Sequence, residues 1–432
     1  MSSEQRVYVY LQLPGSMEVV TAGRYTLSSR EGVAVGHFLY NPAYLTDDRS
    51  VPLEPFTLPL QQRPFETVKL RGIFGALRDA SPDSWGRRVI ERHLARTDLT
   101  ELDFLVHSPD DRAGALSFGH GKEPPAPLRQ YNPVIQLEAL LRLAEEIQED
   151  DHVIHPQAAQ VEGLLRPDTA MGGARPKNVV EDQDGLWIAK FPDRGDRWSN
   201  ARVERAMLEL ARECGINAAI SKVITVGDAD VILVKRFDRD RTDNGYLRSR
   251  MLSGLTVFDV EDTHESRGAW SYLTLADEVR RRSNNPKRDL EELFRRMTFN
   301  ALISNSDDHP RNHAMIAPGR DFMLSPAYDL TPNPQISLEK RDLAMTAGSW
   351  NRYANRENLI SGHGHFMLRP EDASRIVDSM RDVVRSRWRD HLKADGTSEA
   401  DAERVAGAFD YPGFLLDPQV VLRDVGGATP RV

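Results

Sequence analysis

The period of the hydrophobic pattern changes along this chain, and that change limits its fold more than any other feature. Near the N-terminus apolar and polar residues alternate, as in VYVYLQL at residues 7–13, which is typical of half-buried strands. From about residue 250 onward, apolar residues recur every three to four positions, as they do on one face of a helix. We therefore predict an α+β fold, with strands concentrated early and helices late.

Several segments combine a regular pattern with end signals. Ser81 and Pro82 suit an N-cap and a first helical position, and Gly215 suits the left-handed residue after a helix. The predicted helices begin after Ser81 and cover residues 134–148, 200–214 (capped by Ser199 or Asn200) and 290–303. The predicted buried strands are Leu186–Phe191 and Asp230–Phe237.

Composition narrows the class of protein. The 432 residues carry 56 Lys and Arg against 65 Asp and Glu, a net charge of -9, which argues against a free-standing nucleic-acid binder. The single cysteine, Cys214, excludes an internal disulfide and a cysteine-built metal site, and fits a reducing cytosol. No apolar run is long enough for a signal peptide or a bilayer span. We expect a soluble cytoplasmic protein.

The segment NSDDHPRN, residues 305–312, carries the strongest chemical signal. Asp307 and Asn312 stand in the arrangement Asp-x4-Asn. Phosphoryl transfer needs such a pair, because a carboxylate orients the substrate hydroxyl and accepts its proton while an amide oxygen holds Mg²⁺. The alternative is a plain turn, since Asn, Ser, Asp and Pro all favour turns.

A second carboxylate supports the phosphoryl-transfer interpretation. Asp329 lies near the end of the strand-like apolar run Leu324–Leu330. A buried aspartate is costly unless it is paired or bound to a metal, so Asp329 is predicted to hold magnesium. The alternative is a helix N-cap or a turn residue before Thr331 and Pro332.

Lys190 is a lysine within an apolar strand, followed by the helix 200–214. This order is typical of the kinase lysine and its helix glutamate, for which Glu204 is preferred over Glu209. The alternative is an edge-strand lysine whose ammonium reaches water.

The run GGARPK at residues 172–177 predicts a glycine loop, because glycine lets backbone N–H groups approach phosphate oxygens. It matches neither the Walker A pattern nor G-x-G-x-x-G, and alone it would read as a hairpin. Its position in the chain is more informative than its sequence. The glycine loop is followed by the strand lysine, the helix glutamate, the hinge strand, the Asp-x4-Asn segment and a late aspartate, which is the order found in protein kinases.

The sequence resembles the HipA family of serine/threonine kinase toxins from bacterial toxin–antitoxin modules. The resemblance covers nearly the whole chain. It is carried by Phe74–Arg92 (FGALRDASPDSWGRRVIER), by GGARPK, by NSDDHPRN and by Tyr328-Asp329-Leu330.

The resemblance implies a HipA-type, protein-kinase-like fold that uses ATP and Mg²⁺. It divides the chain into a β-rich N-terminal subdomain (1–122), a nucleotide-binding lobe with the glycine loop (134–238) and an all-helical catalytic lobe (239–432). Asp307 would be the catalytic base, and Asn312 and Asp329 would hold the metal. The implied nucleotide-binding residues are Gly172, Gly173, Ala174, Lys177, Lys190, Glu204, Val234, Lys235, Phe237 and His309.

The resemblance also implies partners. Family members phosphorylate a serine or threonine of a cellular protein, with aminoacyl-tRNA synthetases as the known type of target. They pair with a small helix-turn-helix antitoxin, through which they reach DNA. One departure concerns the loop serine whose autophosphorylation switches the family's kinases off: Ala170 stands there, so the switch is either absent or moved to Thr169.

Two other functions stay open. An aminoglycoside-type small-molecule phosphotransferase also carries an Asp-x4-Asn loop, although the first 120 residues favour a dedicated partner-binding subdomain. A catalytically weak, kinase-like binding module would predict the loss of catalytic residues, and all the expected ones are present.

Overall fold

The computed structural model describes residues 5–126, 131–149, 175–261, 263, 265–334, 337–409 and 411–425. The chain divides into two compact units. Unit 1 comprises Met1–Arg194, Ile224–Glu261 and Ala314–Phe322, and unit 2 comprises Gly195–Val223, Asp262–His313 and Met323–Val432. The predicted three-domain boundaries stay a prediction.

The N-terminal part of unit 1 is an antiparallel sheet in the order β4-β3-β2-β1-β5. Its strands are β1 (Gln5–Gln12), β2 (Val19–Arg30), β3 (Val33–Tyr40), β4 (Phe65–Thr67) and β5 (Leu116–Gly119). Glu31 and Gly32 connect β2 to β3, and both have positive φ, as a tight hairpin turn requires. The strand predicted at residues 7–13 is therefore confirmed as β1.

Short helices lie in the segments that connect β3 to β4 and β4 to β5. They are α1 (Pro42–Leu45), the 3-10 turn η1 (Lys69–Gly72), α2 (Gly75–Asp79), α3 (Ser84–Leu94) and α4 (Glu101–His107). The predicted start of α3, with Ser81 as N-cap and Pro82 as first residue, is wrong by two residues. Asp83 is the N-cap, because its carboxylate accepts a hydrogen bond from the Gly86 N–H at 2.7 Å.

A second sheet of five strands has the order β6-β7-β8-β10-β9. Its strands are β6 (Asn132–Pro133), β7 (Lys177–Asp182), β8 (Gly185–Lys190), β9 (Ser221–Val226) and β10 (Ala229–Lys235). The turn η2 (Val134–Gln136) leads into α5 (Leu137–Glu149), which confirms the helix predicted there. Trp85 of α3 and one side of α5 pack with Trp187 and Ala189 in a shared apolar core.

The rest of unit 1 is a hairpin and a strand pair. Strands β11 (Arg239–Thr242) and β12 (Gly245–Arg248) form the hairpin, and β13 (Arg250–Ser253), which precedes α8 (Gly254–Phe258), pairs antiparallel with β14 (Ala314–Ala317). The predicted lobe 239–432 is therefore not all-helical, since these strands and β15 (Met323–Leu324) belong to it. Strands this short escape prediction because two to four residues are too few to show a clear alternation.

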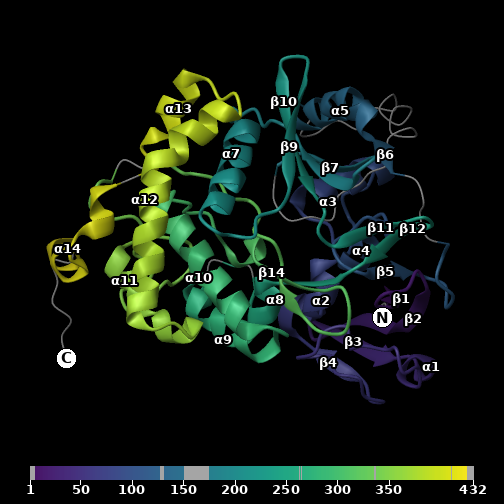
Figure 1. The fold of residues 1–432 in the computed structure, drawn as a ribbon. Helices are drawn as coiled ribbons and strands as arrows, with labels where there is room; N and C mark the ends of the chain where they lie inside the picture. The colour runs from purple at the N-terminus through teal and green to yellow at the C-terminus, as the bar shows by residue number, and fades with distance from the viewer. Residues whose placement is uncertain are drawn as a thin grey trace. The chain divides into compact units, whose positions relative to one another are not determined.

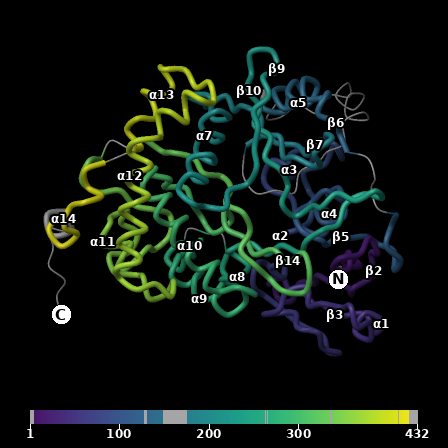
Figure 2. The backbone as a smooth tube through the Cα atoms, in the orientation of Figure 1, coloured from purple at the N-terminus to yellow at the C-terminus, as the bar shows by residue number. Residues whose placement is uncertain are grey.

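Unit 2 is mostly helical (Figures 1 and 2). Its helices are α7 (Asn200–Glu213), α9 (Tyr272–Arg282), α10 (Pro286–Leu302), α11 (Arg356–Ser361), α12 (Pro370–Ala394), α13 (Glu399–Ala406) and α14 (Pro418–Val425), with 3-10 turns η3 (Glu265–Ala269), η4 (Pro310–Asn312), η5 (His363–Phe366) and η6 (Pro412–Leu415). Helix α12 packs against α7, α10 and α11, and α10 also packs against α9.

Local signals explain the ends of two of these helices. Ser199 caps α7, as predicted, and Gly215 follows it with φ of +79°. Asn285 caps α10 and Pro286 occupies its first position. Among the described helices, none offers the long apolar stretch that crossing a bilayer requires.

Candidate active site

The candidate site is a loop that begins where α10 ends. Asn305 is held at the end of the helix, because its N–H donates to the Asn300 carbonyl at 2.8 Å and its amide Nδ2 donates to Asn300 Oδ1 at 3.0 Å. Ser304, with φ of +52°, donates its hydroxyl to the Ala408 carbonyl at 2.6 Å. The loop therefore leaves the helix at a defined point.

Two consecutive aspartates of this loop face opposite environments. Asp307 is exposed, whereas Asp308 is only 1% exposed. The His309 N–H donates to the Asp307 carbonyl at 2.7 Å, and the Asn312 Nδ2 donates to the same carbonyl at 3.4 Å. The predicted Asp-x4-Asn pair is therefore brought together, because the Asn312 side chain contacts the Asp307 backbone directly.

Asp329 lies on a segment whose conformation differs from the predicted one. The strand-like interpretation of residues 324–330 is wrong beyond Leu324, where β15 ends. Asp329 has φ of +60°, a left-handed conformation that is uncommon for a residue other than glycine. Such backbone strain persists only where surrounding contacts impose it, and it is frequent at functional sites.

Contacts on both sides of Asp329 join its segment to the Asp307 loop. The Tyr328 hydroxyl donates to the Arg311 carbonyl at 2.7 Å. The Asn333 Nδ2 donates to Ser306 Oγ at 2.7 Å. Asp329 therefore lies in a stretch that is attached to the loop both before and after Asp307.

The charges around Asp307 affect the pKa of its carboxyl. Partial loss of solvent around the Asp307 carboxyl raises its pKa, and the negative charges of Asp329 and Asp308 raise it further, whereas His309 and Arg267 lower it. A carboxylate with a raised pKa is a stronger general base. The site therefore gathers Asp307, Asn312 and Asp329, together with His309 and Arg267, within unit 2.

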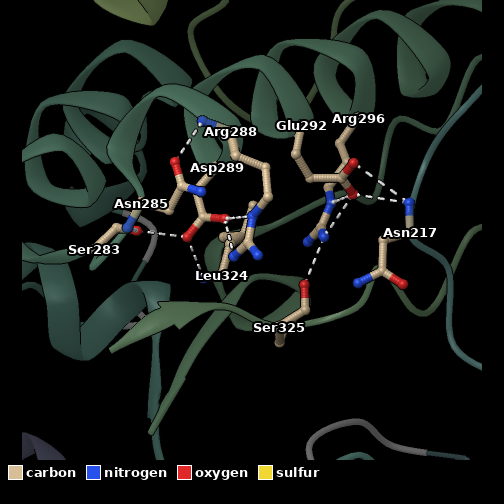
Figure 3. A network of polar contacts seen from close by, with 9 residues as sticks. All are labelled: Asn217, Ser283, Asn285, Arg288, Asp289, Glu292, Arg296, Leu324 and Ser325. Carbon is tan, nitrogen blue, oxygen red and sulfur yellow. Dashed lines mark hydrogen bonds and ion pairs between the residues drawn. The ribbon is translucent and has the colours of Figure 1, made fainter. Parts of the chain in front are cut away.

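A polar network on α10 holds the chain that leads to Asp329 (Figure 3). Asp289 is 2% exposed, and its Oδ2 accepts hydrogen bonds from the Ser283 hydroxyl at 2.7 Å and from the Leu324 N–H at 2.8 Å. Its Oδ1 accepts two bonds from the Arg288 guanidinium, at 2.9 and 2.7 Å. Asp289 therefore fixes the strand β15 to the helix.

A second part of the network lies one turn further along α10 (Figure 3). Glu292 accepts hydrogen bonds from Arg296 at 2.8 and 2.9 Å and from the Asn217 N–H at 3.1 Å. The Arg296 Nη2 also donates to the Ser325 carbonyl at 2.5 Å. Ala327 then exchanges backbone hydrogen bonds with residues 217–219. One helix therefore positions both the Asp307 loop and the Asp329 segment.

Asn312 and Asp329 supply the oxygen donors that Mg²⁺ prefers. The Asn312 Nδ2 is used within the loop, so its Oδ1 is the atom offered to a cation. Across the described ranges, no group of three or more His, Cys, Asp or Glu side chains is arranged to hold a metal. The residues fit magnesium that takes its remaining ligands from phosphate and water, which is the usual pattern for this ion.

The predicted nucleotide residues on the second sheet of unit 1 divide between its two faces. Val234 pairs in register with Ile188, two residues before Lys190, so Val234 and Lys190 project from the same face. Lys235 pairs with Trp187 on the opposite face, where its ammonium lies 5.9 Å from the centre of the indole. The sheet therefore brings Val234, and not Lys235, to the face of Lys190.

Lys177 begins β7 and is buried. Its Nζ lies 2.7 Å from Asp83 Oδ2, and both side chains are 5% exposed. The phosphate contact predicted for Lys177 stays a prediction, while the contact seen is this ion pair. The remaining predicted loop residues, Gly172, Gly173 and Ala174, and the positions Thr169 and Ala170 lie outside the described residues.

The structure also describes three other residues of the predicted nucleotide-binding set. Glu204 is 4% exposed on α7 of unit 2, and its pairing with Lys190 stays a prediction. Phe237 follows β10 and is half-buried. His309 precedes η4, and its Nδ1 is buried without a hydrogen bond to any described residue.

Two groups near Asp307 escaped sequence reasoning. Arg267 lies in η3, which has no regular hydrophobic pattern. The second group is Asp308 with its two contacts. It bonds Tyr272 of α9, which lies 36 residues earlier in the sequence, and His313, which lies 5 residues later. The only available signal was the doubled aspartate, and it does not say which carboxylate faces inward.

Comparison with known families identifies the family of this chain. Residues 18–119 match the model of the HipA N-terminal domain, and residues 169–388, slightly more than half of the chain, match that of the HipA-like C-terminal domain. The chain belongs to the HipA family. The resemblance, the α+β class and the HipA-type fold are thereby confirmed.

A solved HipA has a similar fold. The Shewanella oneidensis MR-1 protein, in a complex of the toxin–antitoxin system HipA, HipB and its operator DNA, has a TM-score of 0.66 at 16% identity, over 93% of this chain and 94% of that chain. At this identity the likeness concerns the fold.

Two curated relatives carry kinase names. The Sinorhizobium fredii protein "Putative kinase Y4dM" is 28% identical over 54% of this chain and 57% of its own length. A Haemophilus influenzae "Putative kinase" is 26% identical over 36% of this chain and 48% of its own length. The matches thus span about half of each relative, and both names point to a kinase.

Proposed function

We propose that this HipA-family chain is an ATP- and magnesium-dependent serine/threonine protein kinase that acts as the toxin of a toxin–antitoxin pair. The observation that carries the proposal is the convergence of three groups. Asn312 bonds the backbone of Asp307, and Asp329 lies close enough for its charge to raise the pKa of Asp307. This is the set that phosphoryl transfer to a hydroxyl requires.

In the proposed reaction, Asp307 orients the substrate hydroxyl and accepts its proton. The hydroxyl oxygen bonds to the γ-phosphorus of ATP as the bond to the β,γ-bridging oxygen breaks, and ADP leaves. Asn312 and Asp329 would hold Mg²⁺, which neutralises phosphate charge when bound. Lys190 would contact the phosphates and Val234 would line the adenine, from one face of the second sheet.

Family membership supports the choice of substrate and partners. A dedicated HipA N-terminal domain at residues 18–119 favours a protein substrate over a small molecule such as an aminoglycoside. The substrate would be a cytoplasmic protein, with an aminoacyl-tRNA synthetase as the type that the resemblance implies. The Shewanella oneidensis complex contains HipB and operator DNA, so we infer a small antitoxin partner that makes the DNA contact.

The test is phosphate transfer from radiolabelled ATP to proteins of a cell extract. Asp307→Ala should reduce incorporation by about 10²–10⁴-fold, the usual contribution of a general base. Asp390→Ala is the control, since Asp390 is 60% exposed on α12 and is not part of the site. Incorporation by the Asp307 variant equal to that of the control, or label found only on small molecules, would contradict the proposal.

A further inference from the structure

Behind the exposed Asp307 lies a buried polar cluster that the proposed reaction does not use. The Asp308 carboxylate Oδ2 accepts hydrogen bonds from the Tyr272 hydroxyl and from His313 Nε2, the latter at 2.7 Å. Tyr272 is fully buried, and His313 and Asp308 are 2% and 1% exposed. The two rings meet edge to face, with centroids 5.6 Å apart.

The cluster connects three elements of unit 2. Tyr272 is the first residue of α9, and its hydroxyl also accepts a hydrogen bond from Asn300 Nδ2 of α10 at 3.4 Å. Asn300 in turn holds Asn305 at the start of the loop. His313 closes η4 directly after Asn312. The start, the middle and the end of the loop are therefore bonded to one buried group of side chains.

The charge balance shows why this cluster keeps its geometry. A buried carboxylate is tolerated only when donors surround it, and removal of one donor leaves an unsatisfied group. Burial and the Asp308 charge hold the pKa of Tyr272 well above its usual value, so the phenol remains a donor. These donors keep the Asp308 carboxylate in the protein interior, and the adjacent Asp307 is directed toward solvent.

We propose that Asp308, held by Tyr272 and His313, is a positioning residue that sets the direction of Asp307 and Asn312 toward the transferring phosphate. Asp308 does not touch the substrate. It acts through the backbone, since loss of its donors would let the loop rotate between residues 305 and 313. The inference rests on the proposed kinase function, because it assigns a role within that reaction.

The test removes a single oxygen atom. Tyr272→Phe keeps the ring and deletes the hydroxyl that Asp308 accepts. We expect kcat to fall by at least about tenfold, since small misplacements of a catalytic group are costly, while KM for ATP changes by less than about threefold. The double variant Tyr272→Phe/Asp308→Asn should be no slower than Asp308→Asn alone, because the two residues act as one unit.

The matched control is Tyr353→Phe. Tyr353 is also fully buried in unit 2, and its hydroxyl donates to the carbonyls of Glu339 and Gly413 at 2.8 Å, away from the loop. Each variant loses the two hydrogen bonds of one buried phenol hydroxyl, so both should lower the thermal midpoint. Only Tyr272→Phe should lower kcat, assayed well below either midpoint.

The outcomes separate this inference from the function on which it rests. If the wild-type chain transfers no phosphate to any protein, the proposed function fails. If the wild-type chain is active and the two variants have equal kcat, the kinase stands and the positioning role of Asp308 is refuted. A fall in kcat confined to Tyr272→Phe, with non-additivity in the double variant, supports it.

Discussion

At the scale of single residues, buried charges reveal most about this molecule. Glu54 in unit 1 is 1% exposed, and its carboxylate accepts hydrogen bonds from the Ala76 N–H and the Thr57 hydroxyl, both at 2.8 Å. Burial raises the pKa of Glu54, the two hydrogen bonds lower it, and the charges of Asp79 and Asp259 raise it, so that the pKa lies at about 7. The folded state therefore binds the Glu54 proton more tightly than the unfolded chain does.

This difference predicts a pH-dependent stability. Below about pH 4.5, Glu54 is neutral in both states and imposes no penalty. As the pH rises toward 7, only the unfolded state ionises freely, so the native state loses up to about 3 kcal/mol. Glu54→Gln can accept from Ala76 and donate to the Thr57 oxygen without ionising, so it should gain stability relative to wild type between pH 5 and pH 8.

Urea unfolding at the two pH values measures the effect. Glu123→Gln is the control, because Glu123 is exposed to solvent and its charge is solvated in both states. A stability difference between Glu54→Gln and wild type that stays constant from pH 5 to pH 8 would show that Glu54 does not carry the predicted penalty.

At this scale the sequence predicted one feature of the candidate site and missed another. The spacing of Asp307 and Asn312 sufficed to pair them, because both lie within one short turn. The left-handed conformation of Asp329 could not be foreseen, since it depends on contacts of Tyr328 and Asn333 with a loop about 20 residues away. Aspartate enters the left-handed region more readily than most residues other than glycine, but that preference does not predict it at a given position.

At the scale of elements, α10 is the support of the candidate site. Its last residues direct the Asp307 loop, and Asp289 near its start holds the backbone of Leu324. The apolar spacing of residues 290–303 predicted the helix correctly, because the pattern is local. It said nothing of Asp289, whose burial depends on a tertiary contact.

Asp289→Ala should therefore destabilise the protein by about 2–4 kcal/mol, because it leaves the buried Leu324 N–H and the Ser283 hydroxyl without an acceptor. It should also slow phosphate transfer by releasing the segment that carries Asp329. Glu291→Ala on the same helix is the control. Among the described residues, the half-exposed Glu291 pairs only with Arg295 one turn away, so the substitution should cost less than about 0.5 kcal/mol.

The free energy of unfolding from urea titration compares the two variants. An Asp289 variant as stable as the Glu291 variant would mean that the network in Figure 3 does not hold β15 to α10.

At the scale of the whole molecule, a ligand that binds only the folded chain raises its stability by mass action. Magnesium and ATP together should therefore raise the thermal midpoint, with a gain of about 2.7 kcal/mol at one hundred times Kd. Asp329→Ala should reduce the gain most strongly in the presence of magnesium, since Asp329 is proposed to bind the metal.

Differential scanning fluorimetry with ATP and either Mg²⁺ or EDTA measures this, and Asp390→Ala again serves as the control. The proposed role of Asp329 as a magnesium ligand would be refuted by an equal shift of the thermal midpoint with Mg²⁺ and with EDTA. It would also be refuted by an Asp329 variant that responds like the control.

The large-scale order of the chain was predictable, because strands and helices differ in hydrophobic period. Helix α5 and strands β8 and β10 lie within a few residues of their predicted bounds. Strands β11, β12 and β13 were not predicted, since each is four residues long and partly polar. Such strands form where neighbouring segments complete their hydrogen bonds, and a local pattern does not contain that information.

The ion pair between Asp83 and Lys177 links the two stretches of this chain that match separate family models. Each member neutralises the other in the protein interior, so a chain that inherited one without the other would keep a buried lone charge. Recombination between relatives that exchanged residues 18–119 alone would therefore yield a poorly folding hybrid unless both parents carried this couple. We therefore expect the N-terminal domain, residues 18–119, and the strand that begins at Lys177 to be inherited together.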